Sequence, residues 1–384
     1  MFRVKTKNIG LYLGILITTI LVVCECYFTL NNYQTISIFI MTFMIGIGAT
    51  IFSRKKCFIA ASIIFMFFIC GLREPIFTDD YQYARMFHSI NGVFLNIFAN
   101  QNEKGYLFLN YVISVFTDEY KIAQIIIIGF GFVFLYKGIA RLQVTIQSSF
   151  IIMYYFFVVL FRFSGAGLVR IQIAVSIFIY AMSCLEKRNL KKFVLMILIA
   201  SFFHRSSLAA LILLLPFCMN NYVRNAKYNH IFLLFLTVLI FSLFDPFITF
   251  LASYLGGKYS QYTNISNFSL SILSIFYICT FAYAISIKKY IDQKNIEFYE
   301  ICLYMFLIAI IFDVFFAFGR INFYFLFSFS FILGFIWKNS EKLFPKITCG
   351  SLFLFFIVMY FQGGQLSDIY IVNFFENYKN MLFK

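Results

Sequence analysis

The chain reads Arg162-Phe-Ser-Gly-Ala-Gly-Leu-Val-Arg170 at its centre, and an apolar run follows as far as Leu185. A basic connection comes next, Glu186-Lys-Arg-Asn-Leu-Lys-Lys192, and a second apolar run breaks at Phe203-His204-Arg205. Long apolar runs bounded by short polar segments predict membrane-spanning helices. Arginine and histidine are costly beside hydrocarbon, so their presence at the ends of such runs indicates a structural or functional role.

The composition is typical of a helical membrane protein. Hydrophobic residues make up 62% of the 384-residue chain and charged residues only 12%, whereas a soluble domain carries about 25% charged residues. The apolar runs are continuous, which favours helices over the alternating pattern of a transmembrane barrel. The net charge of +15 is spread over many short loops, which excludes a single basic face for nucleic acid. We predict an all-α, polytopic transmembrane fold with about 11–13 spans.

Thirteen apolar segments are candidate spans. They are residues 9–29, 33–52, 57–72, 121–139, 149–163, 168–185, 192–203, 206–219, 230–250, 268–287, 299–318, 321–337 and 347–361. No internal repeat or linker divides the chain, so we predict a single integral membrane domain, 1–384. The longest polar segment, 73–120, contains short apolar patches near 93–98 and 106–116, which we expect to form interfacial or re-entrant helices.

The distribution of basic residues predicts the orientation. With the N-terminus in the cytoplasm and alternating spans, 20 of the 31 Lys and Arg residues fall on inner segments and ten on outer ones. This excess on short inner loops fits the positive-inside rule. Arginine is more frequent among the outer basic residues, 6 of 10 against 5 of 20 inside. Topogenic charge does not distinguish Lys from Arg, but phosphate recognition favours the planar fork of a guanidinium.

Residues 192–219 decide the topology downstream. Two runs of 12 to 14 residues are each too short to cross a hydrocarbon core of about 30 Å. As a single span, the segment would place the lysine-rich segments 288–294 and 338–346 outside, against the charge rule. We therefore predict a helical hairpin that enters from the cytoplasm and turns within the bilayer, with His204 at its tip facing a cavity.

The loop after the third predicted span carries a first group of candidate site residues. It reads Arg73-Glu-Pro-Ile-Phe-Thr-Asp79-Asp80-Tyr81-Gln-Tyr83. An acidic pair beside tyrosines at a membrane edge suits the binding of sugar hydroxyls, and one carboxylate could act as a general base on an acceptor hydroxyl. The structural alternative is that one aspartate caps the following helix while the rest of the loop is solvated.

The turn at 162–170 is a second candidate. Gly165 and Gly167 allow a close approach of the backbone to an anion, and the helix that follows offers free N–H groups and the positive end of its dipole. With Arg162 and Arg170 on either side, the turn predicts a pyrophosphate clamp. The alternative is a pair of arginines that extend their side chains to the membrane interface beside a flexible turn.

His204 stands at a break between two apolar runs, where it could act as a base, as a hydrogen-bond donor to substrate or as a structural cap. Asp313 and Arg320 are seven residues apart, and we expect them on one helix face, either as functional groups or as a structural pair. His88 and His230 have no acidic or cysteine neighbours at ligand spacing, and we expect neither a metal site nor another cofactor.

Five segments carry a recognisable pattern, and in chain order they are Asp79-Asp80-Tyr81-x-Tyr83, Glu103-x-Gly105-Tyr106, Leu168-Val-Arg170-Ile-Gln-Ile-Ala174, Phe203-His204-Arg205-Ser206 and Gly319-Arg320-x-x-x-Tyr324-Phe325. Together these segments resemble the EpsG family of Wzy-type polysaccharide polymerases, over roughly residues 60–340. The Arg-x-x-x-Ala run, followed about 30 residues later by Phe-His-x-Ser, is the most specific part.

The resemblance implies a multi-pass glycosyltransferase of the bacterial inner membrane. It would transfer a growing glycan from undecaprenyl diphosphate to a lipid-linked repeat unit on the outer side of that membrane, without a metal. Arginines would hold the donor diphosphate, and Asp79, Asp80 or His204 would deprotonate the acceptor hydroxyl. The implied partners are the undecaprenyl-diphosphate-linked oligosaccharide and the bilayer, and a chain-length regulator is a candidate protein partner.

Three other functions use related features. A flippase or transporter of lipid-linked oligosaccharide also needs arginines and aromatic residues in a cavity, although it should show internal repeats. An O-antigen ligase would use the same donor with a different acceptor. An acyltransferase for surface glycans would depend on one membrane histidine and on a cytosolic acyl donor. The sequence leaves the sugar, the linkage and the type of polymer open.

Overall fold

The computed structural model describes residues 56–71, 78–90, 94–95, 97, 103–156, 158–159, 169–218, 271–315, 319–340 and 343–362. Every regular element in these ranges is a helix, which confirms the predicted all-α fold. By length and composition, five helices in the described part of the chain could cross a membrane. The chain divides into two compact units, residues 1–205 with 360–384 and residues 206–359.

Most predicted spans coincide with helices of the structure. The spans predicted at 57–72, 121–139, 168–185, 192–203, 268–287, 299–318, 321–337 and 347–361 each match a helix to within four residues at either end. The span predicted at 149–163 begins as the helix α8 (Ser148–Tyr154). The spans predicted at 9–29, 33–52 and 230–250 lie outside the described residues.

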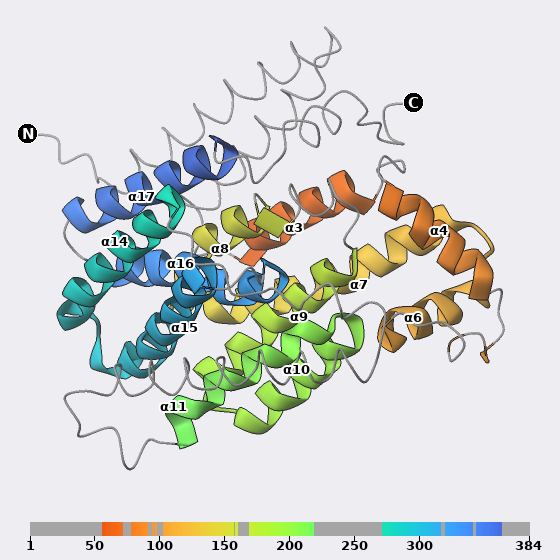
Figure 1. Cartoon of the computed structure of the whole chain (residues 1–384), viewed down its shortest axis with the longest axis horizontal. Coiled ribbons are helices and arrows are strands. Elements are labelled where there is room, and N and C mark those ends of the chain that lie inside the picture. Colours follow the sequence, from red (N-terminus) through yellow and green to blue (C-terminus); the bar gives the residue numbers. More distant parts are fainter. Residues whose placement is uncertain are drawn as a thin grey trace, which may run out of the picture. The chain divides into compact units, whose positions relative to one another are not determined.

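The first unit contains seven of the described helices (Figure 1). In chain order they are α3 (Lys56–Gly71), α4 (Thr78–Ile90), α6 (Lys104–Ser114), α7 (Tyr120–Leu142), α8, α9 (Val169–Glu186) and α10 (Leu190–Phe203). Helix α9 is apolar on all sides, and almost all of its residues are buried. A helix without a polar face belongs in the interior, and α9 accordingly packs between α7 and α10.

Helices α7 and α9 run side by side in the same direction. A Cβ added at Gly131 would meet Ile173, and one added at Gly138, seven residues on, would meet the backbone of Tyr180 at 2.8 Å. From the first contact to the second, the residue number rises by seven on both helices, so α7 and α9 run parallel. Glycine at Gly138 is required because no larger side chain fits between the two backbones. The predicted inner segments around Arg141 and Glu186 therefore lie at the same end of the unit.

A tight connection joins α9 to α10. The Arg188 N–H donates to the carbonyl of Leu185, and the Asn189 N–H donates to the carbonyl of Cys184, both at 2.9 Å. Arg188 has a left-handed φ of 56°. This is the Schellman pattern that ends many helices. Asn189 then caps α10, since its side chain accepts a hydrogen bond from the N–H of Lys192 at 3.1 Å. The connection is short enough that α10 packs back along α9.

Two short helices lie near the start of α7 (Figure 1). Helix α6 has 11 residues and is too short to cross a hydrocarbon core of about 30 Å at 1.5 Å per residue, as predicted for the patch at 106–116. Its membrane depth stays a prediction. Helix α4 contacts both α6 and α7, and Ile90, Ile97 and Leu107 form a small buried cluster beneath these elements.

The second unit is rich in phenylalanine. Its described helices are η2 (Arg205–Leu214), α11 (Leu215–Cys218), α14 (Ile272–Ile287), η4 (Lys288–Tyr290), η5 (Gln293–Asn295), α15 (Ile296–Phe315), α16 (Gly319–Asn339) and α17 (Leu343–Gln362), the last of which ends in the first unit. Phe329 is fully buried, and its ring lies 5.0 to 6.2 Å from five other aromatic rings. Aromatic pairs at such distances stabilise a core beyond their buried area.

The predicted break at His204 is present. Helix α10 ends at Phe203, His204 has an extended backbone, and the narrower 3-10 helix η2 begins at Arg205. Ten residues is long for a 3-10 helix, and such segments often mark strain or a hinge. Whether residues 192–219 turn back as a hairpin stays a prediction, because the boundary between the two units falls between Arg205 and Ser206.

Candidate functional site

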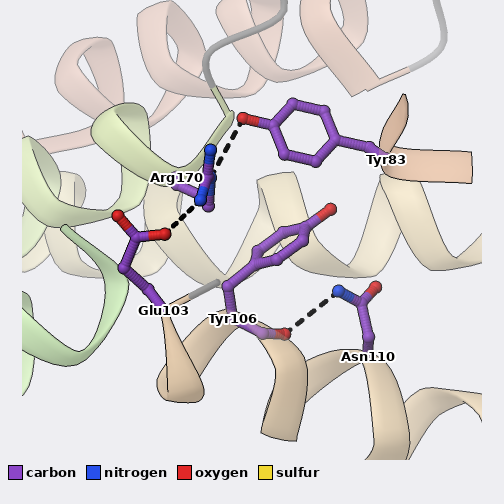
Figure 2. A network of polar contacts seen from close by, with 5 residues as sticks. All are labelled: Tyr83, Glu103, Tyr106, Asn110 and Arg170. Carbon is purple, nitrogen blue, oxygen red and sulfur yellow. Dashed lines mark hydrogen bonds and ion pairs between the residues drawn. The ribbon is translucent and has the colours of Figure 1, made fainter. Parts of the chain in front are cut away.

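Arg170 stands in the first turn of α9 and contacts two residues from distant parts of the sequence (Figure 2). Its guanidinium forms an ion pair with the Glu103 carboxylate, and its Nε donates a hydrogen bond to the Tyr83 hydroxyl at 3.2 Å. The side chains of Arg170 and Glu103 are 22% and 18% exposed. The pair is therefore largely but not completely removed from solvent.

Two tyrosine rings extend this network. The guanidinium carbon of Arg170 lies 5.5 Å from the centre of the Tyr83 ring, within the range of a cation–π interaction. The Tyr83 ring in turn meets the Tyr106 ring edge-on, with 5.2 Å between the centroids. Both tyrosines are buried. The guanidinium is thus held by a carboxylate, a hydroxyl and an aromatic ring, which together leave it little freedom to rotate.

Glu103 is positioned by the start of α6. It occupies the N-cap position with an extended backbone, yet its side chain makes no capping hydrogen bond and instead meets Arg170. The position of α6 depends on Gly105, where an added Cβ would lie 2.7 Å from Cβ of Phe202 and 2.8 Å from its carbonyl oxygen. The start of α6 therefore lies directly against the end of α10, a contact that only glycine permits.

Two polar atoms beside this network make no hydrogen bond of normal geometry within the described part of the chain. They are the Tyr106 hydroxyl and the side-chain oxygen of Asn110. The Asn110 amide nitrogen donates to the backbone carbonyl of Tyr106 at 3.0 Å. Burial raises the pKa of the Tyr106 phenol well above its usual value, and the nearby Asn110 and Arg170 offset only part of the increase. Buried polar groups without partners are uncommon in folded proteins and are often functional.

The acidic pair of the 73–120 segment lies in the first turn of α4, which begins at Thr78. Asp80 is buried, and Tyr83 follows it by one turn on the same face of the helix. The structure thus brings Asp80 toward the side of α4 that carries Tyr83 and meets Arg170. Tyr81, by contrast, is 54% exposed. For Asp79 the structure describes the helical backbone alone.

His204 is buried at the end of α10. Its backbone N–H donates a hydrogen bond to the backbone carbonyl of Ala200 at 2.9 Å. Phe202, two residues earlier, contacts Gly105, two residues after Glu103. The segment that carries His204 and the segment that carries Glu103 are therefore neighbours within the first unit.

The remaining predicted site residues are placed in part or not at all. Arg73 and Arg162, with the glycine turn, lie outside the described residues. Arg320 lies in the first turn of α16, and for it the structure describes the backbone alone. The expectation that Asp313 and Arg320 share one helix face is wrong. Helix α15 ends at Phe315 and α16 begins at Gly319, so the two residues lie on different helices.

Asp313 instead belongs to a polar chain in the second unit. Its carboxylate accepts a hydrogen bond from the Ser274 hydroxyl at 2.6 Å, and that hydroxyl lies 2.8 Å from the hydroxyl of Ser271. Ser271 also caps α14 by accepting from the N–H of Ser274 at 3.0 Å. The Asp313 carboxylate therefore contacts the first turn of α14 and links α15 to α14.

Sequence reasoning missed Glu103 as a site residue, although it stands in one of the segments that carry the family resemblance. Its signal was weak because a single glutamate before a short apolar patch is equally typical of a helix start. Its pairing with Arg170, 67 residues away, depends on the packing of α6 against α7 and α10.

The fold and this network define a class, a multi-pass helical membrane protein with an arginine–glutamate–tyrosine network at the first turn of its most buried spanning helix. The model of the EpsG family matches residues 56–376, and the chain belongs to that family. It is therefore a membrane protein of polysaccharide biosynthesis. No curated protein and no solved structure matches the chain.

Proposed function

We propose that this protein is a polysaccharide polymerase, a glycosyltransferase of the bacterial inner membrane with a cytoplasmic N-terminus. It transfers a growing glycan from undecaprenyl diphosphate to the non-reducing end of a lipid-linked repeat unit on the outer side of the membrane. Its partners are the lipid-linked oligosaccharide, the bilayer and, for control of polymer length, a regulator protein. Family membership supports a role in polysaccharide biosynthesis, and the Arg170 network supports the proposed glycan transfer from a diphosphate.

The observation that carries the proposal is the fixed guanidinium at the start of α9. A guanidinium is suited to a diphosphate because its planar donors match two phosphate oxygens. Glu103 and Tyr83 fix its orientation, and an electrostatic group that is oriented before the reaction stabilises developing charge most effectively. The charge rule independently predicts this end of α9 on the outer side.

The reaction needs a base as well as a cation. The acceptor hydroxyl attacks the anomeric carbon, the bond from that carbon to the diphosphate oxygen breaks, and the diphosphate leaves with its negative charge. The hydroxyl proton passes to a carboxylate or an imidazole. Asp80 is the first candidate because it lies one turn from Tyr83. His204 is the second, because its segment adjoins that of Glu103, and Asp79 is the third.

The remaining predicted residues have binding roles in this proposal. The exposed Tyr81 is suited to stack on a sugar ring, and Tyr83 holds Arg170 through a hydrogen bond and a cation–π contact. Arg73, Arg162 and Arg320 contribute further positive charge for the two lipid-linked substrates, which each carry a diphosphate. Several arginines are expected because the donor and the acceptor are bound at the same time.

The test is a deletion strain that is complemented with variants. Loss of a polymerase leaves lipid carrying a single repeat unit on the outer surface, and the wild-type gene restores long polymer. Arg170→Ala should fail to restore it at normal expression, whereas Arg85→Ala should restore it, because Arg85 is exposed on the same helix as Tyr83. Full-length polymer with Arg170→Ala would refute the proposed role of the arginine. Absence of any repeat unit on the surface of the deletion strain would indicate a flippase instead.

A further inference from the structure

A second group of basic side chains surrounds one tyrosine near the opposite end of α9. Tyr180 is buried, and the guanidinium carbon of Arg141, from α7, lies 4.7 Å from the centre of its ring. The amino group of Lys192, from α10, lies 5.5 Å from the same centre. Three helices therefore bring two cations to one aromatic ring.

The ring is held rigidly in place. The backbone of Tyr180 is in contact with Gly138 of α7, where an added Cβ would lie 2.8 Å away. The ring of Phe134, also from α7, meets the Tyr180 ring edge-on at a centroid distance of 5.9 Å. Arg141 is further fixed by a contact between its guanidinium and the sulfur of Cys184 at 4.0 Å. Packing therefore fixes the ring that both cations contact, and it fixes Arg141 beside that ring.

No carboxylate compensates these two cations within the described part of the chain. Neither Arg141 nor Lys192 forms an ion pair there. The segments 137–145 and 184–192 contain six basic residues and one acidic residue, Glu186, which lies near Lys187 and Thr145. The dipole of α7 favours Arg141 in its last turn, but that of α10 disfavours Lys192 in its first turn. Two half-buried cations that contact the same ring are stabilised by an anion that both can reach.

We propose that Arg141, Tyr180 and Lys192 form a binding site for the phosphate headgroup of an anionic phospholipid. The site lies at the right depth, because Arg141 is next to the last residue of α7 and Lys192 is the third residue of α10. Both side chains are half-buried, so a headgroup reaches them from the membrane interface. Basic groups between spanning helices are suited to anionic headgroups, and the charge rule predicts the cytoplasmic leaflet for this end. This inference is independent of the proposed polymerase activity.

The first measurement uses the wild-type, full-length protein in detergent. Native mass spectrometry with added phosphatidylglycerol or phosphatidylcholine should show about tenfold tighter binding of phosphatidylglycerol, as expected when two basic groups contact one anionic headgroup. Equal binding of the two lipids would overturn the proposal. Millimolar inorganic phosphate should neither displace the lipid nor raise the melting temperature. If phosphate acts as strongly as the lipid, the site binds a soluble anion and the lipid assignment is wrong.

The second measurement compares two double variants that remove the same charge. Arg141→Gln with Lys192→Gln should abolish the preference for phosphatidylglycerol. Lys187→Gln with Lys191→Gln should keep at least half of it, because these lysines are exposed on the same connection. Equal losses in both variants would mean that diffuse surface charge attracts the lipid, which contradicts a defined site. Should the first double variant fail to fold, the single variants Arg141→Gln and Lys192→Gln take its place, and an unchanged lipid preference in both would overturn the proposal.

Discussion

Positive charge is balanced in different ways at the two ends of α9. At its first turn, Arg170 is paired with a carboxylate and a tyrosine hydroxyl. Ten residues further on, the Tyr180 ring is in cation–π contact with both Arg141 and Lys192, and neither cation has an ion-pair partner among the described residues. The same elementary contact, a cation over a tyrosine ring, occurs at both ends. Only the compensation of the charge differs.

This difference separates two uses of an arginine in a membrane protein. A compensated guanidinium has a fixed direction and is prepared for a reaction in which charge changes. An uncompensated pair of cations attracts a permanent anion, and the bilayer supplies such anions in its headgroups. Changes made separately at the two ends of α9 should therefore have different effects.

The largest effect is expected from a double-mutant cycle on Glu103 and Arg170. If they act as a unit, Glu103→Ala and Arg170→Ala should each lower the rate of polymer formation about 100-fold, which is typical for loss of an oriented charge-stabilising group. The double variant should be no worse than either single one. The measurement is polymer yield per amount of protein in membranes.

The matched control is the ion pair between Lys288 and Glu300, which are 33% and 42% exposed. Exposed pairs contribute little, so Glu300→Gln should leave the yield unchanged. Additive losses for Glu103 and Arg170 would contradict the view that they form one functional unit, because independent residues would then act on separate steps.

A smaller effect is expected at the contact that holds α6 in place. Gly105→Ala adds a Cβ that would lie 2.7 Å from Cβ of Phe202. Overpacking of this kind costs about 1–3 kcal/mol and should also displace Glu103 from Arg170. We expect a lower melting temperature in detergent and a polymer yield that falls more than stability alone requires. Gly350→Ala is the control, because among the described residues its added Cβ would have no neighbour closer than 3.8 Å.

If Gly105→Ala lowers the melting temperature but leaves polymer formation intact, then the close contact of α6 with α10 serves stability alone. The Arg170 end would then tolerate displacement, and the contrast between the two ends of α9 would be weaker than proposed.

The smallest effect is expected on stability, from Arg188 in the turn that follows α9. Arg188 has a left-handed φ of 56° at the turn between α9 and α10, which glycine adopts without strain. Arg188→Gly should therefore raise stability by about 0.5–1 kcal/mol, after allowance for the greater freedom of glycine in the unfolded chain. Arg188→Gln removes the same charge without relieving the backbone. A higher melting temperature for glycine than for glutamine is expected, and equal values would show that the charge, not the backbone, is what matters.

Much of the architecture followed from the sequence because continuous apolar runs have only one stable form in a bilayer. The match of α9 and α16 to their predicted spans reflects this constraint. The pairing of Asp313 with Arg320 failed for a local reason, since a seven-residue spacing indicates a shared face only when one helix covers both residues. The break between α15 and α16 removes that condition.

The candidate site was predictable only as a set of residue types. Arg170, Tyr83 and Asp80 were identifiable because charged and aromatic groups at the ends of apolar runs need a reason. Their grouping was not, because it depends on which helices pack together. Gly105 lets α6 approach α10, and Gly138 lets α7 approach α9, but the sequence alone does not reveal which backbone each glycine contacts.

The sequence by itself determined the helical class, most helix boundaries, the asymmetry of charge and the family to which the chain belongs. The tertiary structure decided which cations are compensated. Glu103 and Arg170 are 67 residues apart, and Arg141 and Lys192 come from different helices that converge on Tyr180. The physical reason is that the two properties depend on residues at different distances along the chain. Hydrophobic periodicity is encoded locally along the chain, whereas the partner of a charge is set by which helices pack together.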